Sequence, residues 1–371
     1  METCDVLVIG HGLAGAAVAY EMQPFASVVL VERAPPAPRS ALLLPTHPDT
    51  IDGRLAAASR TFYAHQAGVL AGRPVAVPLD LLQLVPAGQP DQQPEATLPT
   101  DAGEPVEAAE IVEKLPFLAS SGLAGGRLVA DALDLDTGAL HQAYHDTFTA
   151  RGGRLVSEAE PLAIDGDSDG DGAPWRISCG RARFETKVLV DATGPFVEEV
   201  ALAAGLPPLG LLARRQTMLR FEAAAPPPAG MPLIASPDHG LLLKPAGDAF
   251  VAIVTDPEPV ELMGAEPGRD DRAGAIARIE TVTRLQVRHV LASTATLLVE
   301  APDHAPVVGQ DDLVAGFFWV AGEGPDGALA PALARAAASL LVSGVLPDDL
   351  IALKIAPEDL LPLRFREQRE D

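Results

Sequence analysis

The chain has 371 residues, more than one hydrophobic core usually spans, so two closely joined domains are expected, and its 48% hydrophobic residues exclude disorder of the bulk. Its 27 Lys and Arg against 51 Asp and Glu give a net charge of -24, which argues against nucleic acid as a partner, and no apolar run reaches the roughly 20 residues of a membrane span. The only cysteines, Cys4 and Cys179, are too few for a disulfide framework or a zinc site, so we expect a cytoplasmic protein with reduced thiols and no bound metal.

The first elements are predicted to be a strand, a glycine turn, a helix and a second strand. Val6–Ile9 is a short apolar run, typical of a strand buried on both faces of a parallel sheet. The alanine-rich segment Leu13–Met22 predicts a helix that Pro24 ends, and Val28–Val31 predicts the second buried strand. This order is typical of the first part of a nucleotide-binding α/β domain.

The turn between the first strand and the helix is Gly10-His11-Gly12-Leu13-Ala14-Gly15, a GxGxxG motif. The first glycine permits a tight exit from the strand, the second lets the backbone approach a pyrophosphate, and the third lets the helix pack against the sheet. The N–H groups and the positive dipole end of the helix would face the anion. Glu32, at the end of the second strand, can accept hydrogen bonds from both ribose hydroxyls and would repel a 2′-phosphate, which argues against NADP.

The chain leaves this sheet for a long stretch after the second strand. A proline-rich segment precedes a predicted helix over Arg54–Leu70, and a second helix over Leu140–Ala150 precedes a short strand at Arg154–Val156. The next apolar strand, Val188–Val190, comes only after these elements. An NAD-binding domain usually adds its third strand within one more βαβ unit, so the interrupted layout favours FAD.

The pattern changes between Arg214 and Glu300, where longer runs alternate between apolar and polar residues and predict an antiparallel sheet in a second domain. Gly88–Glu107, rich in Pro, Gln, Asp and Gly, is predicted to be a surface loop. Asp165–Gly172 has the acidic oxygens and glycines of a calcium loop but lacks its final glutamate and flanking helices, so we interpret it as a solvated hairpin loop. Near the C-terminus, Phe317–Ala321 predicts a strand and Leu329–Val342 a helix.

Several short motifs occur along nearly the whole chain in an order and spacing that are specific when taken together. Besides the glycine turn they are Val31-Glu32-Arg33, Arg39-Ser40-Ala41, Ala57-Ala58-Ser59-Arg60, Ala139-Leu140-His141-Gln142, Leu209-Gly210-Leu211, Leu243-Lys244-Pro245, Ala301-Pro302-Asp303 and Gly316-Phe317-Phe318-Trp319-Val320-Ala321-Gly322. With these motifs the sequence resembles the D-amino acid oxidase-like (DAO) family of FAD-dependent oxidoreductases. Within that family it looks most similar to the D-arginine dehydrogenases.

The resemblance implies an α/β fold with two domains. Residues 1–75, 136–208 and 301–371 would form an FAD-binding Rossmann-like domain, and residues 76–135 and 209–300 an α+β substrate domain with a large antiparallel sheet. The family's usual reaction is hydride transfer from an amine-bearing carbon to FAD, and the resulting imine hydrolyses to an oxo acid. We therefore expect an FAD-dependent amino acid or amine dehydrogenase or oxidase, acting on a small molecule and passing electrons to an acceptor that the sequence leaves open.

The same resemblance implies which residues bind FAD. They include the glycine turn, with Leu13 and Ala14, and the carboxylate of Glu32. The other cofactor-binding residues expected are Arg33, Arg39, Ser40, Ala41, Leu42, Pro161, Ala192, Gly194, Gly322, Gly324, Gly327 and Ala328.

The expected substrate site departs from the family pattern. The family's carboxylate-binding arginine falls within Thr296–Glu300, where no residue is basic. Glu323 and Asp326 would bring negative charge towards the flavin, and Pro161 lacks the backbone N–H that the family often uses at the adenine. The FAD site therefore looks mostly kept and the amino acid site largely rebuilt.

The candidate catalytic residues are His47, Asp80, Arg215 and His304. Arg214 and Arg215 begin the antiparallel sheet, and the one that faces inward would bind a carboxylate through two parallel N–H bonds. The two histidines would serve as a general base, and Asp80 aligns with an acidic substrate-binding position of the family. Their alternatives are exposed loop histidines, surface or interface arginines and a turn carboxylate.

Three functions remain open from the sequence. The first is the FAD-dependent enzyme, with an altered substrate. The second is an FAD-binding but catalytically altered subunit or regulatory flavoprotein of a larger complex, which would require a partner subunit. The third is a fold remnant that no longer holds FAD, supported only by Pro161 and Pro325.

Overall fold

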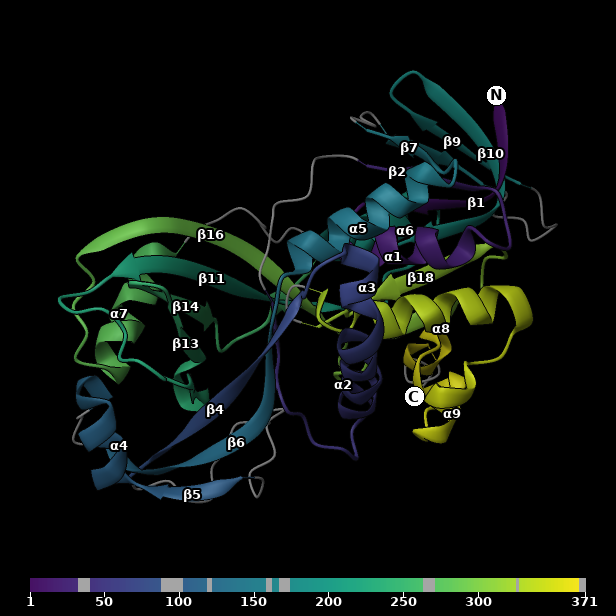
Figure 1. The fold of residues 1–371 in the computed structure, drawn as a ribbon. Coiled ribbons are helices and arrows are strands. Elements are labelled where there is room, and N and C mark those ends of the chain that lie inside the picture. Colours follow the sequence, from purple (N-terminus) through teal and green to yellow (C-terminus); the bar gives the residue numbers. More distant parts are fainter. Residues whose placement is uncertain are drawn as a thin grey trace.

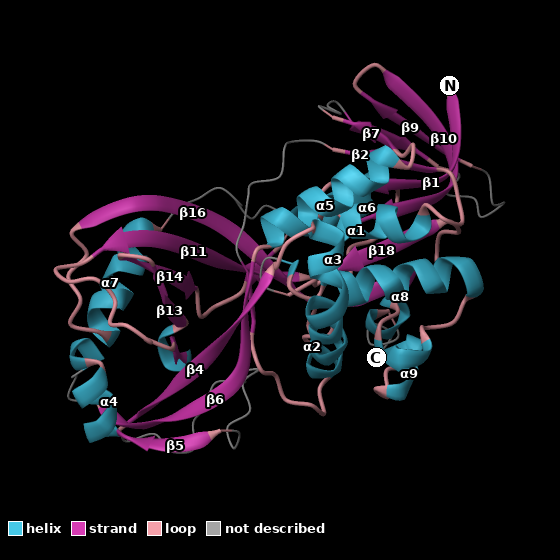
Figure 2. Cartoon of the chain, viewed as in Figure 1, coloured by secondary structure: helices cyan, strands magenta, loops and turns pink. Residues whose placement is uncertain are grey.

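The computed structural model describes residues 1–32, 41–87, 103–118, 122–157, 162–166, 174–262, 271–324 and 327–366. They form two large β-sheets, called sheet A and sheet B, with helices packed on their faces (Figure 1 and Figure 2). This mixed architecture confirms the α/β fold class predicted from the sequence. Within the described residues, no helix has the length and hydrophobicity needed to span a membrane.

Sheet A has the strand order β17-β18-β10-β1-β2-β7, with the hairpin β8-β9 joined to β10. Its strands are β1 (Glu2–Ile9), β2 (Val28–Val31), β7 (Arg154–Val156), β8 (Leu162–Asp165), β9 (Trp175–Cys179), β10 (Ala182–Asp191), β17 (Val307–Gln310) and β18 (Phe317–Ala321). The central strands β18, β10, β1, β2 and β7 run parallel. All the strands predicted for this sheet are therefore present. β10 extends beyond the predicted apolar run Val188–Val190.

The centre of sheet A is apolar on both faces. In β1, Val8 lies in register with Val190 on one side and Leu30 on the other, and all three are fully or almost fully buried. The helices α1 (Leu13–Met22), α5 (Thr137–Ala150) and α8 (Ala330–Ser343) cover one face (Figure 1). The helix α6 (Val197–Ala203) packs on the other face. A strand covered on both faces has no solvent side, which is why its sequence is a continuous apolar run.

The helices in this half of the molecule are α1 (Leu13–Met22), α2 (Ile51–Phe62), α3 (Gly68–Ala71), α5 (Thr137–Ala150), α6 (Val197–Ala203), α8 (Ala330–Ser343) and α9 (Asp348–Ala352). Of these, α1 has the predicted bounds, the helices predicted over Arg54–Leu70, Leu140–Ala150 and Leu329–Val342 are present with different ends, and α6 and α9 were not predicted. The helix predicted from Arg54 begins three residues earlier because Thr50 caps it: its Oγ1 accepts a hydrogen bond from Gly53 N at 3.1 Å. A π-helical segment, Tyr63–Ala67, joins α2 to α3.

Sheet B has the strand order β15-β11-β14-β13-β12-β4-β6-β3, with β16 also paired to β11 and β5 to β6. Its strands are β3 (Ala41–Leu43), β4 (Ala76–Pro86), β5 (Glu104–Glu107), β6 (Leu123–Leu135), β11 (Leu212–Glu222), β12 (Leu233–Ser236), β13 (Leu241–Ala246), β14 (Ala249–Thr255), β15 (Val260–Glu261) and β16 (His289–Glu300). Neighbouring strands are antiparallel except β12 and β4. The large antiparallel sheet expected between Arg214 and Glu300 is thus confirmed, and two long strands from earlier in the chain extend it.

The two faces of sheet B have different neighbours. The outer face packs against α4 (Ala108–Lys114) and α7 (Arg272–Val282), over a core in which Phe221 and Phe250 stack with ring centroids 5.5 Å apart. The other face buries Leu42, Leu81 and Leu233. The strand β3, which the sequence assigns to the FAD-binding domain, pairs with β6 of sheet B. The domain boundaries themselves stay a prediction.

Two loop predictions have different outcomes. Gly88–Glu107 is not a loop throughout, because Glu104–Glu107 forms β5, and this part of the prediction is wrong. Pro105 hides the strand in the sequence but is tolerated at the edge of a sheet. Residues 88–102 lie outside the described residues. Residues 167–173 do so as well, and the strands on either side of them, β8 and β9, pair as an antiparallel hairpin.

Candidate FAD and substrate site

The turn between β1 and α1 has the close backbone contacts that its three glycines predict. Gly10 has φ +104°, and a Cβ there would lie 2.3 Å from the carbonyl oxygen of Ala192 at the end of β10. A Cβ on Gly15 would lie 1.8 Å from the carbonyl oxygen of Gly10. Both positions therefore require glycine for the packing of the turn itself, before any ligand is considered.

Gly12 differs from the other two glycines. It is the N-cap residue of α1, no described side chain caps the helix end, and a Cβ on Gly12 would have no atom of the described residues within 4 Å. The start of α1 therefore has space beside Gly12 that the described residues do not fill. A helix N-terminus with its donors open in this way fits a pyrophosphate, so the residues present suit the FAD phosphates.

Glu32 follows β2 directly and lies beside the turn. Its backbone N–H donates to the carbonyl of Val156 at 2.8 Å, which fixes it to the end of β7, and the residue is 9% exposed. Its Oε2 lies 3.5 Å from Nδ1 of His11, the residue between the first two glycines. Burial, followed by the charges of His141 and His145, lowers the pKa of His11 to about 3, so the imidazole beside Glu32 is neutral.

The loop after β18 packs onto the start of α1. Gly327 has φ +81°, and a Cβ there would lie 3.2 Å from Leu13. The buried hydroxyl of Tyr63 donates to the carbonyl of Ala328 at 3.2 Å and holds this loop from the side of α2. Gly322 and Gly324 also have positive φ angles, +77° and +73°. The expected cofactor residues at the two ends of the chain therefore meet in space.

Of the other expected cofactor residues, some lie in the described part of the chain and the rest lie outside it. Ala41 and Leu42 lie in β3 and are buried, whereas Ala192 and Gly194 lie where β10 ends. Arg33, Arg39, Ser40 and Pro161 lie outside the described residues, as do Pro325 and Asp326.

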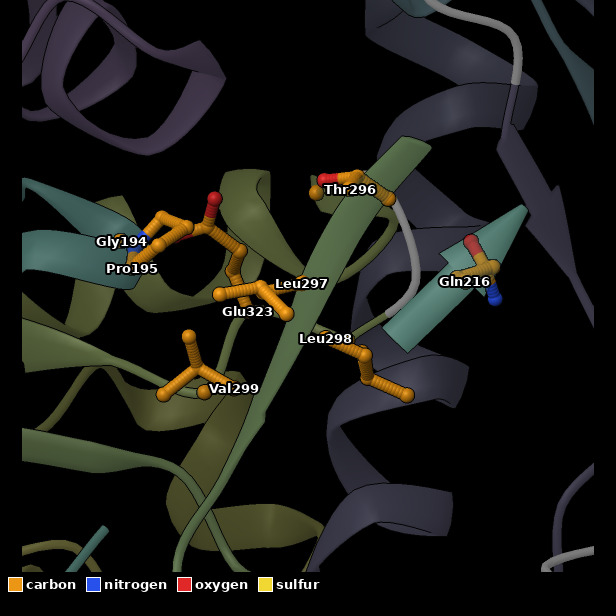
Figure 3. Close-up of a pocket in the computed structure, with 11 residues that line it drawn as sticks. Gly194, Pro195, Gln216, Thr296, Leu297, Leu298, Val299 and Glu323 are labelled. Atoms are coloured by element: carbon orange, nitrogen blue, oxygen red, sulfur yellow. The ribbon is translucent and has the colours of Figure 1, made fainter. Parts of the chain in front are cut away.

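A pocket lies between the carboxyl end of sheet A and the strands β11 and β16 of sheet B (Figure 3). It is lined by Gly194, Pro195, Gln216, Thr296, Leu297, Leu298, Val299, Gly322, Glu323, Gly324 and Gly327. Its glycines belong to the expected FAD site, and its wall from β11 and β16 comes from the other sheet. No lysine, arginine or histidine occurs among these described lining residues.

Strand β11 contributes Gln216 to the lining of this pocket, and Arg215 is not among the described lining residues. Arg215 pairs in register with Leu297, which does line the pocket. The Arg215 guanidinium lies 3.8 Å from the carboxylate of Asp256, which is also bound by Arg278 of α7 at 3.1 Å. The structure therefore directs the Arg215 side chain to Asp256, and its substrate-binding role stays a prediction. The polar group that β11 contributes to the lining is the amide of Gln216.

Arg214 shares the strand face of Gln216 and pairs with Glu300, its Nε 3.0 Å from the carboxylate. Glu300 ends β16, directly after the pocket residue Val299. His304 also belongs to this group, with Nδ1 3.8 Å from Glu300, although its side chain is half exposed. Burial, followed by the charges of Glu300 and Asp303, raises the pKa of Asp52 in the first turn of α2 to about 7. The sequence did not indicate this carboxyl.

His47 and Asp80 have a different position from His304. His47 precedes α2 in an exposed loop, where its Nδ1 accepts a hydrogen bond from the backbone N–H of Asp49 at 3.2 Å. Asp80 lies at an irregularity in the pairing of β4 with β6, and its side chain is exposed. None of the three, His47, Asp80 or His304, belongs to the described residues that line the pocket. His304 differs only in its contact with Glu300, next to the lining residue Val299.

Asp191 is a buried acid at the end of β10 and has no exposed surface. Its Oδ1 accepts hydrogen bonds from the hydroxyl of Thr193 at 2.6 Å and from the Thr193 N–H at 3.1 Å. Its Oδ2 has no hydrogen-bond partner among the described residues. Burial outweighs the Thr193 hydrogen bonds and raises the pKa of Asp191 to about 8, so the group is mostly protonated at neutral pH.

The class of protein follows from comparison with known families. The sequence model of the FAD dependent oxidoreductase family, DAO, matches residues 5–340. The chain belongs to this family, and FAD is its cofactor. The resemblance drawn from its motifs is thereby confirmed at the level of the family.

Solved structures with the same fold cover nearly the whole chain. Glycine oxidase from Geobacillus kaustophilus superposes with a TM-score of 0.72 at 19% identity, covering 92% of this chain and 95% of that one. L-alpha-glycerophosphate oxidase from Mycoplasma pneumoniae, with FAD bound, has a TM-score of 0.77 at 16% identity and the same coverages, 92% and 95%. L-proline dehydrogenase from P. horikoshii has a TM-score of 0.75 at 15% identity and covers 99% of both chains. At these identities the likeness concerns the fold.

Proposed function

We propose that this protein oxidises the C–N bond of a small amine or amino acid, with transfer of a hydride from the substrate carbon to its FAD. The observation that carries the proposal is the pocket in which residues of β11 and β16 face the glycine loop after β18. In that position a substrate would lie between sheet B and the part of sheet A that we assign to FAD. The resemblance of the sequence motifs to those of D-arginine dehydrogenases supports the type of reaction, and the substrate class is inferred from the lining of the pocket.

We assign the FAD-binding roles residue by residue. The open N–H groups at the start of α1, next to Gly12, would hold the pyrophosphate. The Glu32 carboxylate would accept hydrogen bonds from the adenosine ribose, and the loop from Gly322 to Ala328 would approach the flavin ring and its tail. When bound, FAD supplies the hydride acceptor of the reaction.

The wall from sheet B would orient the substrate and exclude water. Gln216 is 4% exposed, and its amide nitrogen donates to Thr255 Oγ1 at 3.2 Å, so its amide oxygen is the acceptor it can offer to the pocket. Leu298 lines the pocket on the same strand face as Gln216 and would exclude water from the reacting carbon. An ammonium or amine N–H is the substrate group that suits an amide oxygen.

An amine must lose its ammonium proton before it can release a hydride, because the nitrogen lone pair has to stabilise the developing cation. We assign the acceptor of this proton to the group formed by Asp52, Glu300 and His304. A carboxyl with a pKa of about 7, as Asp52 has, is poised to accept a proton near neutral pH. His304 remains part of the proposal through its contact with Glu300.

The charge of the pocket favours a substrate without a free α-carboxylate. An arginine or lysine would be needed to pair with that carboxylate, and the described lining residues include neither, but they do include Glu323. A cationic amine suits such a lining better than a zwitterionic amino acid.

The proposal is tested by anaerobic reduction of the purified FAD protein. A panel of D- and L-amino acids and of amines without a carboxylate is added while the flavin absorbance near about 450 nm is followed. Bleaching by an amine would support the proposal, and bleaching by simple amines alone would support the inferred substrate class. If dithionite bleaches the flavin and no amine or amino acid does, the protein is not an amine-oxidising enzyme, and the catalytically altered subunit becomes the better description.

A further inference from the structure

Three histidines from two elements meet behind the phosphate turn. The His11 side chain, in the turn, is only 6% exposed. Its ring centroid lies 4.6 Å from that of His141 and 5.1 Å from that of His145. His141 and His145 are one turn apart on α5, so both imidazoles lie on the face of the helix that packs against the turn. Among the described residues these side chains do not form a cluster that could hold a metal ion.

The contacts of the three rings form a chain that ends at Glu32. Nε2 of His141 lies 2.8 Å from the backbone carbonyl of His11 and donates to it, since a carbonyl can only accept. Nδ1 of His145 lies 3.3 Å from Nε2 of His11. On the other side of the same ring, Nδ1 of His11 lies 3.5 Å from Oε2 of Glu32.

These contacts select one tautomer of His11. A carboxylate can only accept, so the N–H of His11 belongs on Nδ1, where it faces Glu32. Nε2 is then an acceptor, and His145 donates to it from its own Nδ1. The low pKa of His11, caused first by burial and then by the two neighbouring imidazoles, agrees with a ring that carries a single proton.

We propose that His11 is a positioning residue for FAD, whose Nδ1–H holds the Glu32 carboxylate in the orientation that accepts the ribose hydroxyls, while His145 fixes the tautomer. The inference rests on the proposed assignment of Glu32 to the ribose. The distance of 3.5 Å exceeds that of a strong hydrogen bond, so the contact orients the carboxylate without occupying it fully.

A neutral donor suits this task better than a cation. Glu32 is nine-tenths buried, so its carboxylate needs hydrogen bonds to remain ionised. A lysine or arginine in place of His11 would satisfy the carboxylate by itself and would compete with the ribose hydroxyls for its oxygens. One neutral imidazole N–H uses a single acceptor position of the carboxylate, whereas a cation would bind the same oxygens more strongly.

The test measures the affinity of the full-length apoprotein for FAD, from the quenching of flavin fluorescence. We expect His11→Ala to raise the Kd for FAD about tenfold, equivalent to about 1.4 kcal/mol. His11→Asn should restore affinity to within about threefold of the original chain, because its amide nitrogen lies near the position of Nδ1. His11→Gln is the matched control, since its amide nitrogen lies nearer the position of Nε2, and it should behave like His11→Ala.

A double-mutant cycle separates positioning from packing. In a Glu32→Ala background the added His11→Ala change should alter the Kd less than about twofold, because His11 then has no carboxylate to orient. Thermal melting of each apoprotein provides the control for folding. A tenfold effect of His11→Ala in both backgrounds, or equal affinity of the Asn and Gln variants, would overturn the role proposed for His11.

The cycle also distinguishes this inference from the assignment on which it rests. If Glu32→Ala alone leaves the Kd for FAD unchanged, the ribose assignment fails, and the role of His11 fails with it. If Glu32→Ala weakens binding while the coupling between the two positions is absent, only the role of His11 is lost.

Discussion

The two ends of the site are built in different ways. At the phosphate end, the turn, the helix start and Glu32 all come from the first 32 residues, and their positions follow from one strand-turn-helix-strand unit. At the substrate end, the pocket wall comes from four separate places, after β10 and β18 and within β11 and β16. The first end is determined locally, and the second depends on how two sheets come together.

This difference shows which parts of the site a sequence motif can predict. Gly15 is required by its own neighbours in the chain, because a Cβ there would lie only 1.8 Å from the carbonyl oxygen of Gly10. The inward face of β11 depends on strand register, where a shift of one residue exchanges Arg215 for Gln216. We therefore expect changes at the phosphate end to have large effects and single changes at the pocket wall to have smaller ones.

Gly15 and Gly12 provide the sharpest test at the phosphate end. Gly15→Ala should lower the free energy of unfolding of the apoprotein by about 3 kcal/mol or more, because the new Cβ meets the Gly10 carbonyl. Gly12→Ala should change that stability by less than about 1 kcal/mol, since its Cβ enters open space and φ is -68°. It should nevertheless weaken FAD binding tenfold or more. Urea unfolding and FAD titration measure the two effects, and similar behaviour of both variants would contradict the separation of packing from binding.

Glu32→Lys should abolish retention of FAD during purification, a loss of at least about a hundredfold in affinity, or roughly 2.7 kcal/mol. An ammonium cannot accept hydrogen bonds from the ribose hydroxyls, and its burial beside His11 is costly. The flavin absorbance per mole of protein is the measurement. Glu280→Lys, the same charge reversal at an exposed position of α7, is the control and should keep its flavin. Full flavin content in the Glu32 variant would remove the ribose assignment.

Asp191 should make the free energy of unfolding depend on pH, and an uncharged amide at the same position should not. The pKa of Asp191 is raised to about 8, so between about pH 4 and pH 8 the folded state holds a proton that the unfolded state has released. Its contribution to stability is therefore complete at low pH and is lost as the pH rises, with a slope of up to about 1.4 kcal/mol per pH unit. Asp191→Asn should remove this slope. Urea unfolding of both proteins at pH 5, 7 and 9 checks the difference, and parallel profiles would mean that Asp191 is ionised in the folded state.

Variants at Gln216 and Arg215 compare the two faces of β11. Once a substrate is known, Gln216→Ala should lower kcat/KM about tenfold, the value of roughly one hydrogen bond to a charged group. Arg215→Ala should leave kcat/KM within about twofold and lower stability by about 1 kcal/mol, because its guanidinium contacts Asp256. The opposite pattern would return the substrate-binding role to Arg215.

The sequence predicted much of the fold and less of the site. The five parallel strands of sheet A, the helix after the glycine turn and the antiparallel character of sheet B were predictable, because their periodicity and glycines act within short segments, whereas β8, β9 and β17 were not predicted. β5 was missed because Pro105 conceals an edge strand. His11 occupies a position that the GxGxxG motif does not specify, and no local signal shows that two residues of α5 pack against it.

What the sequence determined by itself is the phosphate turn with Glu32, the family and its cofactor, because these depend on the spacing of residues within one supersecondary unit or on motifs in fixed order. The tertiary structure alone decided that Gln216 rather than Arg215 lines the pocket, that Glu300 brings Arg214 and His304 together, and that the α5 histidines meet His11. These contacts join residues far apart in the chain. Their geometry is set by strand register and by the packing of helices against sheets, which the periodicity of a single segment does not record.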